Sequence, residues 1–148
     1  MPSKTTVKRA KADLRAGKKP STAAGEFVRE EMEHIREGKH GARSAKQAIA
    51  IGLSKARRSG VPLQAPEEGS TSRRTRQSAK RDLATGQGRR KPRSTSARRR
   101  RSTAKALRNE PRSAASHRAL SRQAKQAARR RRRATTAKKR STRKRASR

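Results

Sequence analysis

Hydrophobic residues follow helical spacing in the first 63 positions of the chain and then almost disappear. The first such pattern places Val7, Ala10 and Leu14 on one face of a helix. We expect this helix to run from about residue 5 to residue 16, with Gly17 ending it. Pro20 should then break the chain before the next helical segment.

A second helix is predicted over residues 23–37, with Ser21 or Thr22 as its N-cap and Gly38 at its end. Its apolar stripe consists of Ala24, Val28, Met32 and Ile35, with Phe27 beside it. The same segment contains five of the ten acidic residues of the chain, Glu26, Glu30, Glu31, Glu33 and Glu37. We expect these carboxylates to form salt bridges with the basic helices around them.

The third predicted helix has the clearest boundaries. Ser44 and Gln47 are spaced as a capping box, in which the two residues satisfy each other's exposed amides. Gly60 and Pro62 follow the helix and end it. The apolar face is narrow and consists of Ala45, Ile49, Gly52, Leu53 and Ala56. A glycine inside a helix costs about 1 kcal/mol relative to alanine, so Gly52 predicts close packing against another helix.

Beyond Leu63 the pattern of hydrophobic positions stops. A linker at 64–70 precedes a segment in which Leu83, Leu107 and Leu120 are the only large aliphatic residues. Chains with so few hydrophobic and so many charged residues usually remain disordered. The predicted fold is therefore all-α, with a small module of three short helices at 1–63 and a linker and long disordered basic tail at 64–148. Only the alanine-rich stretch 113–128 is expected to become helical, once phosphates neutralise its charge.

One internal repeat has its second copy in the segment that is predicted to be disordered. Residues 10–17, AKADLRAG, recur as AKRDLATG at 79–86. Both copies are followed by a Lys-Pro turn and a Ser-Thr pair. Chance similarity and a second short helix that docks only on DNA or on a partner explain the repeat equally well.

The net charge of the chain indicates what kind of partner it binds. The chain has 46 Lys and Arg residues against 10 Asp and Glu, a formal charge of +36. A protein with this charge repels itself, so a polyanion is the expected partner. Arginine outnumbers lysine by 31 to 15, which favours phosphate because a guanidinium group matches two phosphate oxygens at once.

Several other classes of protein are excluded or disfavoured. The chain has no cysteine, and no apolar run approaches the length of a signal peptide or membrane span. Of the three histidines, His34 follows Glu30 by one helical turn and His40 lies six residues further on. No complete set of metal ligands is apparent, so we expect no enzyme, no metal and no cofactor.

The mode of nucleic-acid binding also follows from composition. Phe27 is the only aromatic residue, whereas modules that read single strands stack bases on aromatic side chains. We therefore predict sequence-independent binding of duplex DNA through its phosphates, with a histone-like role in compacting the nucleoid in the cytoplasm. The predicted phosphate contacts are Arg57, Arg58, Arg98, Arg99, Arg100, Arg101, Arg129, Arg130, Arg131, Arg132 and Arg133.

Two alternative functions remain open. The first is association with RNA or the ribosome, in which basic tails also lie between phosphates. The second is a protein-interaction module at 1–63 that the tail merely tethers, with a partner protein that is unknown.

Residues 46–60, KQAIAIGLSKARRSG, and the preceding 25–31, GEFVREE, resemble a family of small basic bacterial proteins. Members of that family are largely uncharacterised, and some are described as DNA-binding or plasmid stabilization proteins. The resemblance covers residues 1–63 and extends to 113–121, and it implies a bacterial origin. The tail is similar to bacterial linker-histone-like proteins in composition only.

Overall fold

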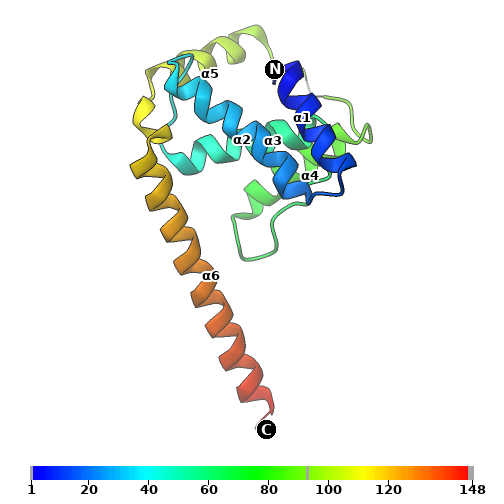
Figure 1. Ribbon diagram of the computed structural model, residues 1–148, viewed down its shortest axis with the longest axis vertical. Helices are drawn as coiled ribbons and strands as arrows, with labels where there is room; N and C mark the ends of the chain where they lie inside the picture. Colours follow the sequence, from blue (N-terminus) through cyan, green and yellow to red (C-terminus); the bar gives the residue numbers. More distant parts are fainter. Residues whose placement is uncertain (1, 93, 147–148) are drawn as a thin grey trace.

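The computed structural model describes residues 2–92 and 94–146, with side chains up to residue 136. The described chain is all-α and contains helices along nearly its whole length (Figure 1). The elements are α1 (Lys4–Arg15), α2 (Pro20–Arg36), α3 (Ala45–Arg58), α4 (Arg73–Gly86), α5 (Ala97–Asn109), the short 3₁₀ helix η1 (Arg112–Ala115) and α6 (His117–Ala146). The first three correspond to the three predicted helices, and the others lie in the segment predicted to be linker and tail.

Helix α2 is the centre of the fold, because it packs against both α1 and α3. Phe27 and Ile35, both on α2, are fully buried and lie in different clusters. The first cluster joins α1, α2 and the end of α3 through Ala10, Ala23, Ala24, Phe27, Ala56 and Val61. Most members are alanines, so the helices approach each other closely around a few large side chains.

Gly52 marks the closest approach of α3 to α2. A methyl group built on Gly52 would lie 2.8 Å from the Cα atom of Val28 and 3.0 Å from its Cγ2 atom. Neither helix could move away without separating the core between them. The prediction that Gly52 allows tight helix packing is confirmed.

Helix α4 packs against α3, on the side away from the short loop that joins α5 to η1. Its buried residue is Ala79, and its Asp82 accepts a hydrogen bond of 2.6 Å from the hydroxyl of Ser54 on α3. At its end, Gly86 lies so close to Arg57 that any side chain there would overlap the Arg57 carbonyl oxygen. The segment after Leu63 is therefore part of the folded body.

The second copy of the internal repeat forms a helix, as one interpretation of it required. The helices that contain the two copies are both capped by a serine whose side chain accepts the amide of a threonine three residues later, Ser3 with Thr6 in α1 and Ser72 with Thr75 in α4. In each copy the repeated alanine, Ala10 or Ala79, is the residue buried against the neighbouring helix. Helix α4 packs on α3 within the chain itself.

The second cluster draws on residues far apart in the sequence. Met32 and Ile35 of α2 and Ala48 of α3 pack against Ala114 and Ala115 of η1, which are 4% and 0% exposed. Leu120, near the start of α6, packs against the edge of this cluster. Arg36 reinforces the contact by donating from Nε to the carbonyl oxygen of Ala115 at 3.1 Å. The first turn of α6 is thus anchored to the body.

Helix α5 lies outside both clusters. It has no buried residue and packs against no other described helix. Its C-terminal end is held by the loop after α2, where Gly41 donates its amide to the carbonyl oxygen of Leu107 at 2.7 Å. A side chain at Gly41 would overlap the backbone of Glu110, so the contact requires glycine.

The prediction of a long disordered tail from residue 64 was wrong. Helices α4, α5 and α6 and the 3₁₀ helix η1 occupy this region. The residues that it packs against the helices of the first 63 residues include Ala79, Ala114, Ala115 and Leu120. The composition argument considered large aliphatic side chains, whereas this segment packs through alanine, which is both the best helix former and a frequently buried residue. The fold is one helical body, formed by α1, α2, α3, α4, η1 and the first turn of α6. The rest of α6 projects from this body as a helical arm.

The predicted N-cap of α3, Ser44, is confirmed, whereas the predicted start of α2 was wrong. Gly17, Gly38 and Gly60 follow α1, α2 and α3 with positive φ, as expected of C-terminal glycines. Helix α2, however, begins at Pro20 with Lys19 as its N-cap, and neither Ser21 nor Thr22 caps it. Proline is compatible with the first helical position because that residue has no intrahelical amide bond to lose.

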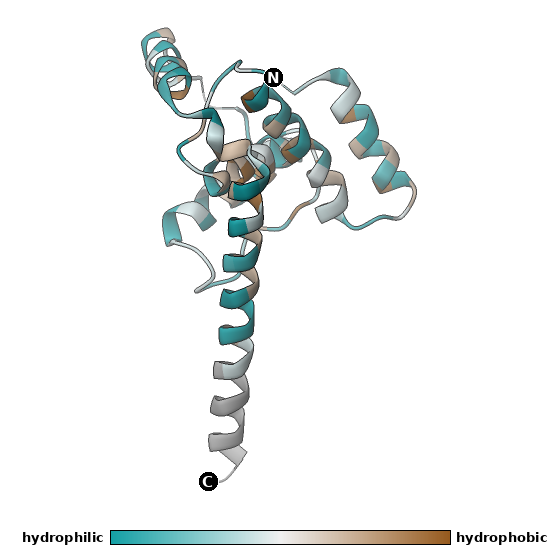
Figure 2. Ribbon diagram, turned by 60° about the vertical axis from the view of Figure 1, so that its left-hand side comes forward, coloured by the Kyte–Doolittle hydropathy of each residue, from teal (hydrophilic) through white to brown (hydrophobic). Residues whose placement is uncertain are grey.

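Figure 2 shows the arm as a single helix whose described surface is mostly hydrophilic. At about 1.5 Å per residue, a helix of 30 residues is about 45 Å long. Among the described residues, no helix combines the length and the hydrophobicity needed to cross a bilayer.

Candidate nucleic-acid interface

Arg57 differs from the other predicted phosphate contacts because its side chain serves the fold. The residue is 7% exposed, and its guanidinium donates to the carbonyl oxygens of Leu63 (3.1 Å) and Gln64 (3.1 Å). Burial lowers the pKa of Arg57 from its ordinary value, and the carboxylate of Asp82 opposes this effect. These bonds hold the chain as it leaves α3, so the guanidinium of Arg57 is occupied within the fold.

Arg58 points outward from the same turn of α3. Its side chain is 53% exposed, with Nε 3.4 Å from the carbonyl oxygen of Ser54 and 3.8 Å from a carboxylate oxygen of Asp82. It borders a shallow hollow that also includes Arg81 and Arg90. Arg58 therefore remains available to an external phosphate, in company with cations from α4 and the loop after it.

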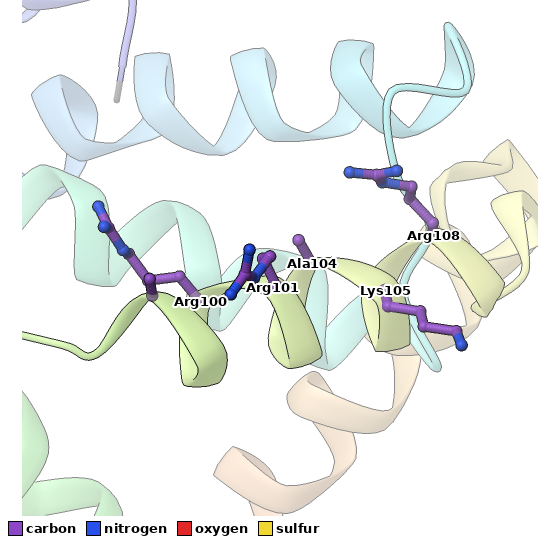
Figure 3. A pocket seen from close by; sticks show the side chains of 6 residues that line it. Arg100, Arg101, Ala104, Lys105 and Arg108 are labelled. Carbon is purple, nitrogen blue, oxygen red and sulfur yellow. The ribbon is translucent and has the colours of Figure 1, made fainter.

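The block Arg98–Arg101 forms the start of α5, which Ser96 caps. Its members are exposed and spread around the helix. Two of them, Arg100 and Arg101, line one hollow together with Lys105 and Arg108, and Ala104 lies between these cations (Figure 3). This face borders an open hollow of about 730 Å³. Small residues flanked by guanidinium groups leave room for a phosphate backbone along the helix.

The arginines at the start of α5 also oppose the helix dipole. The N-terminal end of a helix has partial positive charge and favours anions, yet its first turn contains no acid. Lys105 lies one turn after Arg101, and like charges at this spacing destabilise a helix. An anion bound here would relieve both unfavourable interactions.

The block Arg129–Arg133 lies on the part of α6 that projects from the body, and all five side chains are exposed. Successive residues of a helix point about 100° apart, so these guanidinium groups surround the arm. A duplex that approaches from one side would meet only part of the block.

A one-sided basic stripe begins earlier on α6, and of its four members sequence reasoning named only Arg129 as a contact. Arg118, Arg122, Lys125 and Arg129 follow each other at intervals of four and three residues, which places them on one helix face. All are exposed, whereas Leu120, Gln123 and Ala127 on other faces are partly buried. The spacing was visible in the sequence, but residues 113–128 were expected to be helical only after phosphate binding, so their cations were not assigned to helix faces.

The stripe meets cations of the body. The start of α3 and the start of α6 enclose a hollow of about 240 Å³ whose lining includes Arg43, Lys46 and Arg122 and no acidic residue. Positive charge therefore continues from the helical body onto the arm. This continuity places the two parts in one surface.

Helices α5 and α6 differ from the rest of the fold in their ion pairs. Salt bridges occur in the body, as between Glu31 and Lys55, and in the loop before α4, between Glu68 and Arg76. Among the described side chains of α5 and α6 there is none, and neither helix contains an acidic residue. The cations of these two helices lack any neutralising partner within the described part of the chain.

The acidic residues of α2 only partly follow the expectation of salt bridges to basic helices. Glu31 pairs with Lys55 of α3, whereas Glu26 pairs with Arg29 on its own helix and Glu30 accepts the amide of Ser3 at 2.7 Å. The structure also brings Glu31 together with His34 and His40. Sequence reasoning considered Glu30 with these histidines and overlooked Glu31, because His40 lies in a loop whose path the sequence does not reveal.

Comparisons of the chain with models of protein families, with curated proteins and with solved structures find no match. The resemblance of residues 25–31 and 46–60 to small basic bacterial proteins stays a prediction.

Proposed function

We propose that the protein binds duplex nucleic acid, primarily DNA, through phosphate contacts made by α5, the stripe on α6 and the adjoining cations of the body. One observation carries the proposal, namely that the described cations of α5 and α6 have no acidic partner. Partners for so many exposed guanidinium groups must come from outside the chain, and phosphate is the anion that they match best.

The binding is independent of base sequence. The only aromatic side chain, Phe27, is fully buried in the core, so no base can stack on it. Contacts to phosphates position a protein on a duplex without reading its sequence. A histone-like role in organising or compacting a bacterial nucleoid follows from such binding, because the body and the arm offer cations on two separate elements.

A charge-matched comparison in the full chain tests the interface. The first variant replaces the stripe residues Arg118, Arg122, Lys125 and Arg129 with glutamine. The second replaces the same number of exposed cations on α1, Lys4, Lys8, Arg9 and Lys11. Because each lost phosphate contact lowers the slope of log K against log salt by about 0.9, we expect a decrease of up to about 3.6 for the stripe variant and little change for the α1 variant.

Equal decreases in the two variants would show that net charge alone determines affinity and would contradict this interface. A third variant, with Arg130–Arg133 replaced by glutamine, tests the helical geometry. Since those side chains surround the arm, we expect a smaller decrease than for the stripe, although the charge loss is equal. A flexible tail would give equal decreases.

Competition between substrates separates DNA from RNA. We expect duplexes of unrelated sequence to compete equally for the labelled complex, and structured RNA to compete less well. Preferential competition by structured RNA would instead favour the RNA- or ribosome-associated function.

A further inference from the structure

The second half of α2 and the loop that follows it form a cluster of ionisable side chains at the edge of the core. Glu31, His34 and His40 each direct one potential ligand atom into it, and these atoms all lie within 4.8 Å of one another. Their side chains are 1%, 23% and 18% exposed. The cluster lies in the body, beside the loop whose Gly41 amide donates to Leu107 at the C-terminal end of α5.

Glu31 has an unsatisfied oxygen in this cluster. Its Oε2 accepts a hydrogen bond of 2.5 Å from Lys55 Nζ, but its Oε1 is buried and has no hydrogen-bond partner. Oε1 lies 3.3 Å from Nε2 of His40. A buried carboxylate oxygen without a donor is unfavourable, so this atom needs a cation or a proton beside it.

The surroundings of His40 favour a cation. Its Nδ1 atom lies 3.1 Å from the carbonyl oxygen of Gly41. A hydrogen on Nδ1 is the donor that this carbonyl requires, which leaves the lone pair on Nε2 facing Glu31 in the neutral ring. Metal-binding histidines are commonly held in this way, with one nitrogen donating to a backbone carbonyl and the other on the metal.

Glu30 lies beside His34, the remaining member of the cluster. Its Oε1 accepts the amide of Ser3 at 2.7 Å and lies 3.8 Å from Nε2 of His34. Its Oε2 is also buried without a hydrogen-bond partner. Two carboxylates therefore lie beside two imidazoles and one ammonium group, Lys55, so the carboxylates outnumber the permanent cation in a cluster that could accept a divalent cation.

We propose that Glu31, His34 and His40 bind a divalent transition metal ion, with Zn²⁺ as the best match. Two imidazole nitrogens and one carboxylate oxygen are a donor set that zinc accepts, whereas Mg²⁺ and Ca²⁺ prefer oxygen ligands alone. The ion joins α2 to the loop that holds the end of α5. Because the ion binds only the folded arrangement, it stabilises the fold.

Titration of the metal-free full-length chain with zinc chloride tests the proposal, by calorimetry and by the increase in melting temperature. We expect one zinc ion per chain, no comparable effect of magnesium chloride, and a decrease in zinc affinity of at least about tenfold for His40→Gln or His34→Gln. The matched control is His117→Gln, because His117 is exposed at the start of α6 and lies outside the cluster. This control should retain the affinity of the original chain.

Lys55→Gln should change the zinc affinity in the opposite direction to the histidine variants. It removes the ammonium group that competes for Glu31, so zinc affinity should increase even if the metal-free variant melts at a lower temperature. Absence of stoichiometric zinc binding, or equal losses for His117→Gln and His40→Gln, would overturn the proposal and leave a proton shared by Glu31 and His40 as the occupant. Far-ultraviolet circular dichroism of each variant establishes that it is folded.

Discussion

At the scale of single residues, the fold depends on how closely helix backbones approach each other. Ten of the buried hydrophobic residues of the body are alanines, and only a few side chains as large as Phe27 and Ile35 lie among them. In such a core, glycine and alanine allow neighbouring helices to approach closely, and the few large side chains fill the remaining space. Gly52 and Gly86 are the extreme cases.

Replacing Gly52 with alanine should destabilise the protein, although alanine is the better helix former. The added methyl group would meet the backbone of Val28 at 2.8 Å, and overpacking of this kind typically costs about 1–3 kcal/mol. Urea unfolding followed by circular dichroism measures the change.

Gly25→Ala is the matched control. Gly25 also lies inside a helix, but it is exposed and has no atom within 4 Å of the position of the added methyl group. Here only the helix propensity changes, so the free energy of unfolding should increase by about 0.5–1 kcal/mol. Changes of the same sign in both variants would contradict the packing described for Gly52.

At the scale of elements, the helices differ in what holds them. Helices α1, α2, α3 and α4 are held by burial, whereas α5 has no buried residue and α6 is packed only near its start. The 3₁₀ helix η1 therefore has a larger role than its four residues suggest. It fixes the direction in which the arm leaves the body.

Ala115→Gln should destabilise the contact between η1 and α2. Ala115 is fully buried, and a larger polar side chain there must displace Met32 or Ile35 of the second cluster or push η1 outward. We expect a loss of about 1–3 kcal/mol in the free energy of unfolding and faster amide exchange at the start of α6. Ala124→Gln, on an exposed face of α6, should change neither quantity appreciably.

At the scale of the whole molecule, the division at residue 63 does not coincide with a gap in the packing. Helix α4 covers α3, and Ala114, Ala115 and Leu120 complete the second cluster from the far side of that division. The packed body extends to the start of α6.

Two truncations should therefore behave differently. A chain that ends at residue 128 keeps every residue of both clusters, and we expect it to unfold cooperatively within a few degrees of the full chain. A chain that ends at residue 63 lacks α4, η1 and Leu120, so it should lose helical signal and cooperativity. Thermal unfolding by circular dichroism distinguishes them. A cooperative transition of the shorter chain at the original temperature would contradict the single body.

The sequence predicts the helices that pack through large aliphatic residues better than those that pack through alanine. Large aliphatic side chains at helical spacing predicted α1, α2 and α3, and Gly52 predicted a close crossing. Alanine is ambiguous, since the same residue is exposed on α6 and buried in η1. Ala79 and Ala115 were therefore missed, and with them the folding of the second half.

The candidate sites divide in a similar way. Runs of arginine are obvious in the sequence, but their usefulness to a ligand depends on helical phase, which separates the stripe of Arg118 and Arg122 from the encircling block. Arg57 and Arg58 are neighbours in the sequence, yet one is buried and the other exposed. The meeting of Glu31 with His40 depends on a loop, and no periodicity predicts the path of a loop.

A stiff arm has a consequence that a flexible one would lack. A flexible chain of the same length explores a sphere around its point of attachment, whereas a continuous helix such as α6 points in one direction from its anchored first turn. If the body and the far end of the arm rest on different duplexes, the distance between those duplexes is fixed to within the bending of one helix. Assemblies built by this protein should then show a regular spacing between neighbouring duplexes.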